Sequence, residues 1–213
     1  MVQILFVTGI GTGIGKTVVS AILAEALQAD YWKPVQAGYE EGTDSEWVRS
    51  MLSNTKSKVY PETYLLKLPA SPHIAAREEG RTISLEKIFS SFSQHVVPNR
   101  RLIIEGAGGL LVPLNEHELV MDLIRKLNAK TVLVSRNYLG SINHSLLTAQ
   151  VCRQKSLRVA GWIFNDQFME YENDIVQWSG YPHLASIGKM ETIDKAMIRE
   201  KAAELREKIL QVL

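Results

Sequence analysis

Short runs of apolar residues alternate along the chain with longer segments in which apolar residues recur every three or four positions. A short apolar run bounded by polar or glycine-containing turns is typical of a buried strand, and the longer pattern is typical of an amphipathic helix. We predict strands at residues 2–7, 31–35, 101–105, 131–134, 159–164 and 184–187, with a small strand at 63–66 in an otherwise irregular stretch from 53 to 68. We predict helices at residues 18–27, 45–52, 73–79, from 85, and at 118–127, 140–155, 170–178 and from 193.

This alternation places the chain in the α/β class, as a mostly parallel sheet with helices on both faces. In such sheets, ligands bind at the carboxyl ends of the strands. The polar residues that follow the predicted strands should therefore gather at one edge. A length of 213 residues suits one domain, which we place over residues 1–213.

Residues 9–17 join the first predicted strand to the first helix and read Gly-Ile-Gly-Thr-Gly-Ile-Gly-Lys-Thr. A glycine-rich loop that ends in Gly-Lys-Thr between a strand and a helix is typical of a phosphate-binding P-loop. In such a loop, backbone N–H groups and the helix start hold phosphates. Lys16 would reach the outer phosphates, and the Thr17 hydroxyl would bind magnesium. The sequence therefore predicts a P-loop NTPase fold.

The spacing of this loop departs from the usual P-loop pattern. That pattern has a glycine five places before Gly15, where this chain has Ile10, and the glycine lies one place earlier, at Gly9. A glycine-rich turn that binds no phosphate is the alternative, but the flanking strand and helix favour the P-loop. A dinucleotide-binding fingerprint fits less well, because no register gives Gly-x-Gly-x-x-Gly.

Composition narrows the classes of partner and compartment. Lys and Arg number 24 against 23 for Asp and Glu, so a net charge of +1 gives no broad electrostatic footprint for nucleic acid or an anionic membrane. No apolar run approaches the roughly 20 residues that span a bilayer, and the first residues do not read as a secretion signal. The single cysteine, Cys152, permits no internal disulfide, is expected in the core, and favours a reduced, cytoplasmic setting.

Three charged residues outside the loop are candidates for phosphate chemistry. Glu105 ends an apolar strand and precedes Gly-Ala-Gly-Gly, and P-loop proteins place an acidic magnesium ligand at such a strand end. Lys33 follows a strand and precedes a proline, so we interpret it as a second cation facing the reacting phosphoryl group rather than as a solvated charge. For Asp44, capping its own helix and binding metal are equally good interpretations.

Several motifs, spread in order across nearly the whole chain, together resemble the dethiobiotin synthetase family. No single motif is specific, but the combination is. The motifs are Lys33-Pro34-Val35-Gln36-Ala37-Gly38, Ser71-Pro72-His73, Glu105-Gly106-Ala107-Gly108-Gly109 with Pro113-Leu114, Leu139-Gly140-Ser141-Ile142-Asn143-His144, Leu147-Thr148-Ala149-Gln150, and Gly161-Trp162 with Asn165-Asp166.

This resemblance implies a homodimeric carbon–nitrogen cyclo-ligase of biotin biosynthesis that uses ATP and Mg²⁺. Such an enzyme closes the ureido ring of dethiobiotin from 7,8-diaminononanoate and carbon dioxide. The reaction passes through a carbamate and a carbamic-phosphoric anhydride and releases ADP and phosphate. The chemistry agrees with the residues, because cations at Lys16 and Lys33 would lower the pKa of the substrate amine and stabilise the carbamate. No protein nucleophile is required.

The resemblance also implies a role for each matching residue. Lys16 and Lys33 would be the catalytic cations, and Thr17, Asp44 and Glu105 would hold Mg²⁺. The nucleotide would be bound by Gly11, Thr12, Gly13, Ile14, Gly15, Lys16, Thr17, Val18 and, at the adenine, Asn165. The diamine would be bound by Thr12, Lys33, Ala37 and Gly108, with its carboxylate held across the dimer interface by Gly140, Ser141, Ile142 and Asn143.

Three departures from the family pattern concern substrate and nucleotide contacts. The family loop usually reads Gly-Thr-Asp-Thr-x-Val-Gly-Lys, whereas Gly11 replaces the Asp and Gly13 occupies position x. Ala37 stands where a serine or threonine is common. The tail after Ile187 reads Gly-Lys-Met-Glu in place of a proline-rich segment near the base, which leaves the choice of nucleotide base open.

Other functions share parts of this pattern. A partitioning or cell-division ATPase switch would act on protein partners, but such proteins carry a second lysine five residues before the P-loop lysine, where this chain has Gly11. An amidotransferase-type synthetase of cobalamin synthesis carries a glutaminase domain, for which this chain is too short. An inactive paralogue, suggested by Gly13 and Ala37, is a third alternative.

Overall fold

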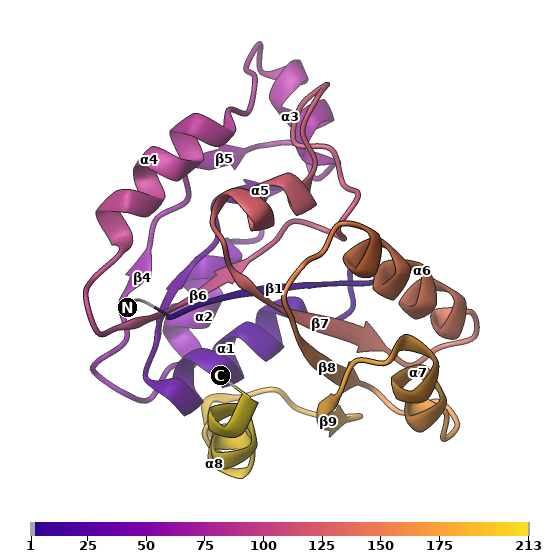
Figure 1. Cartoon of the computed structure of the whole chain (residues 1–213). Coiled ribbons are helices and arrows are strands. Elements are labelled where there is room, and N and C mark those ends of the chain that lie inside the picture. Colours follow the sequence, from indigo (N-terminus) through magenta and orange to yellow (C-terminus); the bar gives the residue numbers. More distant parts are fainter. Residues whose placement is uncertain (1–2, 213) are drawn as a thin grey trace.

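A seven-stranded sheet with the strand order β4-β2-β6-β1-β7-β8-β9 forms the centre of the computed structural model, which describes residues 3–212 (Figure 1). Each neighbouring pair in this sheet is parallel. Because β1 has β6 on one side and β7 on the other, the strand order reverses at β1, and such a switch point opens a crevice at the carboxyl ends of the strands. The strands are β1 (Gln3–Gly9), β2 (Asp30–Trp32), β4 (Val59–Tyr60), β6 (Arg101–Glu105), β7 (Lys130–Arg136), β8 (Val159–Asn165) and β9 (His183–Gly188).

Helices cover both faces of this sheet, as the sequence predicts (Figure 1). On one face lie α1 (Lys16–Leu27), α2 (Asp44–Met51) and α8 (Lys195–Val212). On the other lie α4 (Leu85–His95), α5 (Val120–Lys126), α6 (Ser141–Gln154) and α7 (Glu172–Ser179). Successive strand residues point to opposite faces, so Leu5 and Val7 join the core under α1 while Phe6 joins the other core.

The segment after β2 corrects the prediction of one strand at residues 31–35. Strand β2 ends at Trp32, and β3 (Val35–Ala37) pairs in parallel with β5 (Tyr64–Leu66) in a separate two-stranded sheet, beside which lies α3 (Pro72–Glu78). Pro34 lacks the N–H that a central strand must donate, and its carbonyl instead accepts hydrogen bonds from the N–H groups of Thr63 and Tyr64. Lys33 therefore leaves the main sheet at its carboxyl end.

Helix α2 also starts differently from the prediction, because Thr43 rather than Asp44 is its N-cap. The hydroxyl of Thr43 accepts from the N–H of Glu46 at 3.1 Å, and the Glu46 carboxylate accepts from the N–H of Thr43 at 2.9 Å. This reciprocal pair is a capping box. The interpretation of Asp44 as a cap is thus wrong, and its carboxylate is free for another partner.

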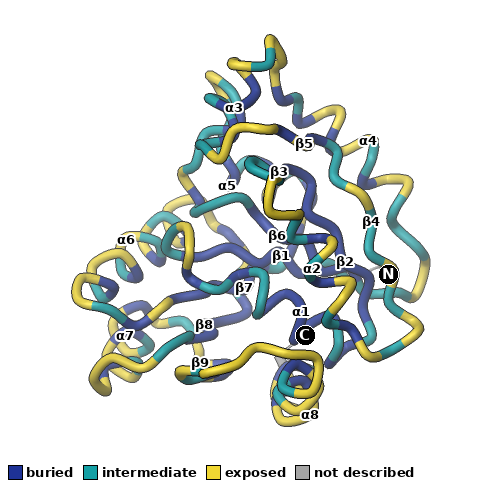
Figure 2. Tube along the Cα trace, turned by 180° about the vertical axis from the view of Figure 1, so that it is seen from behind, coloured by how far each residue is buried: buried dark blue, intermediate teal, exposed yellow. Residues whose placement is uncertain are grey.

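Burial follows the layered arrangement (Figure 2). The central strands are buried, and the exposed residues lie mainly on the outer sides of the helices and in the loops. Cys152 is fully buried, and burial raises its pKa to about 12, which confirms a core residue rather than a nucleophile. Among residues 3–212, no helix combines the length and the apolar character that a membrane crossing requires.

Candidate functional site

The loop between β1 and α1 depends on glycine at three positions, for reasons of backbone conformation and of space. Gly13 and Gly15 adopt left-handed conformations, with φ of +70° and +88°, which favour glycine. Gly9 meets a different demand, because a Cβ there would lie 2.0 Å from the carbonyl oxygen of Val134 in β7. The glycine that seemed displaced in the sequence therefore lets β1 run closely beside β7 as the loop begins.

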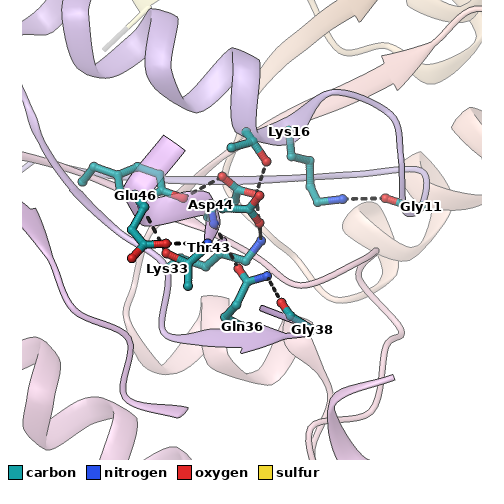
Figure 3. Close-up of polar contacts among 11 residues, drawn as sticks. Gly11, Lys16, Lys33, Gln36, Gly38, Thr43, Asp44 and Glu46 are labelled. Atoms are coloured by element: carbon teal, nitrogen blue, oxygen red, sulfur yellow. Dashed lines mark hydrogen bonds and ion pairs between the residues drawn. The ribbon is translucent and has the colours of Figure 1, made fainter. Parts of the chain in front are cut away.

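Lys16 is the first residue of α1 and is buried at the bottom of this loop. Its Nζ donates to the carbonyl oxygen of Gly11 at 2.6 Å (Figure 3). Burial lowers the pKa of Lys16 to about 8, and nearby Lys33 adds to the lowering, while Glu105 and Asp44 oppose it. The hydrogen-bond partner of Lys16 Nζ in this structure is the neutral carbonyl of Gly11. Phosphate oxygens bound at the start of the helix would give this ammonium a negatively charged partner.

Glu105, at the end of β6, is 1% exposed and is the centre of a charged cluster. Its Oε1 accepts from the Thr17 hydroxyl and from Lys33 Nζ, both at 3.0 Å, and its Oε2 accepts from the Tyr31 hydroxyl at 2.9 Å. Burial and the charge of Glu105 raise the pKa of Tyr31 well above its usual value, so this hydroxyl stays protonated and donates.

Lys33 lies between two carboxylates, because it forms ion pairs with both Asp44 and Glu105. Figure 3 labels Lys33 and Asp44. Burial acts to lower the pKa of Lys33, but Glu105 and Asp44 together outweigh burial and raise that pKa above its usual value. The ammonium of Lys33 is therefore charged at neutral pH. The two buried lysines of the site therefore differ, because the pKa of Lys16 is lowered and the pKa of Lys33 is raised.

Thr17, Asp44 and Glu105 bring a hydroxyl and two carboxylates together, and hard divalent cations such as Mg²⁺ prefer oxygen ligands of this kind. The two carboxylates already accommodate one positive charge in this structure, the ammonium of Lys33. This donor set, completed by phosphate oxygens, therefore fits Mg²⁺.

A cleft of about 760 Å³ opens over these residues. Most of the residues that the sequence predicts for the site line it, namely Thr12, Gly13, Gly15, Lys16, Thr17, Val18, Lys33, Ala37, Asp44, Glu105 and Gly108. A second pocket of about 290 Å³ adjoins the other side of the P-loop and contains Gly13, Ile14, Gly15, Val18 and Asn165 together with Arg136, Asp166, Lys189 and Met190. The cleft and the side pocket thus share Gly13, Gly15 and Val18 of the P-loop, whereas Lys33, Asp44 and Glu105 line only the cleft and Asn165 lines only the side pocket.

The start of α6 lies apart from this cleft. Among the described residues that line the cleft, none comes from the 140–143 segment. Gly140 caps α6 with φ of +100°, and the buried Ser141 hydroxyl pairs with the Tyr171 hydroxyl at 2.7 Å, while Asn143 is exposed. Gly11 lines a groove of about 350 Å³ that it shares with α6 residues such as Leu147. The four predicted carboxylate-binding residues therefore do not meet Lys33 within one chain.

Sequence reasoning missed three contacts of this site. Tyr31 lies in an apolar strand, where its hydroxyl was the only signal of a polar partner. Gln36 donates from Nε2 to the Gly38 carbonyl at 2.7 Å and shapes the loop after β3. Asn165 donates from Nδ2 to the carbonyl of Ile14 at 2.7 Å, so it holds the P-loop as well as facing the side pocket.

The fold resembles that of P-loop ATPases of known structure. The septum site-determining protein MinD of Pyrococcus horikoshii, solved with Mg-ADP, superposes with a TM-score of 0.59 at 14% identity, covering 98% of this chain and 94% of that one. The pNOB8 ParA protein bound to nonspecific DNA superposes with a TM-score of 0.58 at 8% identity, covering 100% and 98% of the two chains. At these identities, the likeness shows the fold alone.

Sequence comparison is more specific. A family model described as an AAA domain matches residues 3–197. The ATP-dependent dethiobiotin synthetase of Cytophaga hutchinsonii is 48% identical over 201 residues, covering 94% of this chain and 95% of that protein. The corresponding protein of Christiangramia forsetii is 40% identical over 208 residues, covering 97% and 98%. Identity at this level over nearly the full length of both relatives means that the chain belongs to the ATP-dependent dethiobiotin synthetase family.

Proposed function

We propose that this protein is a dethiobiotin synthetase that joins 7,8-diaminononanoate to CO₂ at the expense of ATP, as one domain over residues 1–213, acting in the cytoplasm. The observation that carries the proposal is the meeting of Lys33, which leaves the sheet after β2, with the P-loop and Glu105 in a single cleft. A loop that only bound nucleotide would need no second buried ammonium beside the metal-binding carboxylates. Family membership supplies the substrate class.

The reaction begins with an unprotonated amine of the diamine, which attacks CO₂ and releases a proton to solvent to form a carbamate anion. The ammonium of Lys33, held charged by Glu105 and Asp44, would favour the unprotonated amine and stabilise the carbamate anion. A carbamate oxygen then attacks the γ-phosphorus of ATP and ADP leaves. The second amine attacks the carbamate carbon, phosphate leaves with the former carbamate oxygen, and loss of a proton gives the cyclic urea.

Lys16 and the P-loop would hold the transferred phosphoryl group during these steps. Lys16 gains its full charge when phosphate oxygens replace the Gly11 carbonyl as its partner. Mg²⁺, held by Thr17, Asp44 and Glu105, would neutralise charge on the phosphates. Thr12, Ala37 and Gly108, which line the same cleft, would contact the diamine. Since Ala37 carries no hydroxyl, it offers only an apolar contact there.

The nucleotide base would occupy the side pocket beside Asn165. Asn165 already donates to Ile14, so it links the base pocket to the phosphate loop, and the same residue would contact adenine. Lys189 and Met190 complete this pocket in place of the family's proline-rich segment. They are the positions at which we expect the choice among ATP, CTP and GTP to be made.

A second copy of the chain would complete the site. Residues 140–143 do not line the cleft of their own chain, which leaves the substrate carboxylate to a neighbour's α6. Exposed apolar side chains also lie on this side of the molecule. Leu111 and Leu147, which line the groove that contains Gly11, are 54% and 57% exposed, and Leu139, which directly precedes Gly140 at the start of α6, is 87% exposed. Burying them between two copies is the simplest use of that surface.

A partitioning-type ATPase switch is the second function that shares this fold. The signature lysine of that class would stand at position 11, where this chain has glycine and uses its carbonyl to hold Lys16. That arrangement favours the synthetase.

The direct test is incorporation of labelled bicarbonate into dethiobiotin by the purified protein with MgATP and the diamine. We expect a labelled cyclic urea in proportion to ADP released. Release of ADP without any cyclic urea would overturn the proposal. Light scattering tests the dimer, which we expect to dissociate in Leu147→Asp.

A further inference from the structure

Of the three described side chains that hydrogen-bond Glu105, Tyr31 lies outside the cleft, whereas Thr17 and Lys33 line it. It is fully buried in β2 and lies beside Ile103 of β6, two residues before Glu105 on the same face of the sheet. The cleft contains Thr17 and Lys33, which share Oε1 of Glu105, but it does not include Tyr31 among its described lining residues. The Tyr31 hydroxyl donates instead to the other carboxylate oxygen, Oε2, at 2.9 Å.

Because the two oxygens of Glu105 have different partners, the orientation of its carboxylate is restricted. A glutamate side chain has three rotatable bonds, so a carboxylate at a strand end can turn either oxygen toward a cation. A donor fixed in the sheet on one oxygen restricts that rotation and keeps the other oxygen directed at Thr17 and Lys33. Outer partners of this kind commonly orient metal-binding side chains.

We propose that Tyr31 is the positioning residue of the metal site, which orients Glu105 from within the sheet so that Oε1 faces Thr17 and the bound cation. This inference rests on the metal role proposed for Glu105 above. It assigns to a core tyrosine a function that its burial alone would not require, because a phenylalanine would fill the same apolar space.

The chain provides a matched control in Tyr60. Tyr60 lies in β4, which pairs with β2 on the side opposite to β6. Its hydroxyl donates to Asp30, another buried carboxylate, at 3.4 Å. Asp30 belongs to the amino end of β2, so the Tyr60 contact is remote from the cleft. Replacing either tyrosine by phenylalanine removes one hydroxyl from one buried carboxylate and leaves the ring in place.

The test measures binding of ADP by calorimetry, once with Mg²⁺ and once with EDTA, and takes the ratio of the two dissociation constants as the metal-dependent gain. We expect Tyr31→Phe to reduce this gain roughly tenfold while the affinity for metal-free ADP stays within twofold. Tyr60→Phe should leave both values unchanged. In a Glu105→Gln background, Tyr31→Phe should cause no further loss, because its effect passes through Glu105.

Several outcomes would overturn the inference. An unchanged metal-dependent gain in Tyr31→Phe would show that the hydroxyl does not position Glu105. An equal loss of metal-free affinity would show a general distortion of the site. Absence of any metal-dependent gain in the unmodified protein would remove the metal role itself, whether or not cyclic urea is formed.

Should Tyr31→Phe fail to fold, the unmodified sequence labelled with 3-fluorotyrosine gives an independent answer. We expect the fluorine resonance that shifts in Glu105→Gln to shift also when Mg²⁺ is added to the ADP complex. A resonance that is insensitive to Mg²⁺ would count against the inference.

Discussion

Two buried carboxylates lie at opposite ends of the neighbouring strands β2 and β6, and they look alike when burial and hydrogen bonding are considered alone. Asp30, at the amino end of β2, is 1% exposed and accepts from Arg100, from the backbone of Lys58 and from Tyr60. Glu105, at the carboxyl end of β6, is equally buried and accepts from Lys33, Thr17 and Tyr31. Each carboxylate is paired with a cation and with a tyrosine.

The difference lies in what surrounds each pair. The partners of Asp30 lie at the amino ends of the strands. Arg100 also donates to the carbonyl of Lys56, so this cluster links the chain before β4 to the chain before β6. The partners of Glu105 include a P-loop threonine and a lysine that line an open cleft. A buried ion pair therefore lies within the Asp30 cluster at one end of these strands and lines an open cleft at the other, at the carboxyl ends of the strands, where ligands bind in parallel sheets.

The largest effect should come from Lys33→Gln, which removes the ammonium between Glu105 and Asp44. We expect turnover to fall by about two to three orders of magnitude, as is common when a charge-stabilising group is lost, while ATP binding changes little. Dethiobiotin formation and ATP calorimetry measure the two effects. Lys58→Gln, which changes an exposed lysine at the other edge, is the control. Normal turnover in Lys33→Gln would remove its catalytic role.

Next in size is Glu105→Gln, which keeps the shape of the side chain and removes its charge. We expect the Mg²⁺ concentration for half-maximal activity to rise at least roughly tenfold, because a neutral amide is a weaker ligand for a hard cation. A Mg²⁺ titration of activity gives the answer, and an unchanged titration would reduce Glu105 to a structural residue.

Asp30→Asn should lower the stability of the protein and leave its Mg²⁺ dependence and turnover unchanged, which is the reverse of what we expect for Glu105→Gln. The substitution leaves Arg100 without its carboxylate partner, and we expect a loss of about 2 kcal/mol in the free energy of unfolding. The Mg²⁺ titration and the turnover number should stay within twofold. Urea unfolding measures the first effect, and a large loss of turnover in a folded Asp30→Asn protein would contradict the separation of the two ends.

A smaller loss of ligand affinity is expected from Asn165→Ala, which removes an uncharged polar side chain at the carboxyl end of β8. Because Asn165 donates to the Ile14 carbonyl, binding of tripolyphosphate, which has no base, should weaken about threefold to tenfold through loss of this hydrogen bond. ATP should weaken more if Asn165 also contacts adenine. Equal tripolyphosphate affinity in the two proteins would confine Asn165 to the base.

The smallest effect concerns the pH dependence of Lys16. Its pKa of about 8 means that the free protein holds only half of this proton at pH 8, and phosphate binding should restore it. Uptake of up to about half a proton on ADP binding is therefore expected at pH 8 and should vanish in Lys16→Met. Calorimetry in buffers of different ionisation enthalpy measures it. Stability has the matching sign, since a lowered lysine pKa makes folding more favourable as pH rises from about 8 toward the unfolded value of 10.5.

Local pattern was sufficient for most of the fold. The strands around residues 101–105 and 131–134 follow from continuous apolar runs, and the helix after residue 84 follows from its cap, because these signals depend on neighbours in the sequence. The strand at 31–35 was wrong because Pro34 divides one apolar run between two sheets, and only the pairing of Val35 with Tyr64 shows where the second half belongs.

For the site, residue types at strand ends predicted Lys33 and Glu105, and the spacing of Gly-Lys-Thr predicted the phosphate loop. The same reasoning left Asp44 divided between two roles, because it overlooked the Thr-x-x-Glu capping-box pattern of Thr43 and Glu46, which the structure shows as a reciprocal pair of hydrogen bonds. Tyr31 gave no usable signal, because a tyrosine in an apolar strand is indistinguishable from a core aromatic until its hydroxyl is seen beside Glu105.

The sequence by itself determined that this protein is a parallel α/β structure with a phosphate loop, because periodicity and loop chemistry are local properties of the chain. Only the tertiary structure decided which buried charges share a cleft, which of the two buried carboxylates faces that cleft, and that residues 140–143 do not line it. Those outcomes depend on distances between strands that lie 70 or more residues apart in the chain, such as the two that bring Lys33 to Glu105.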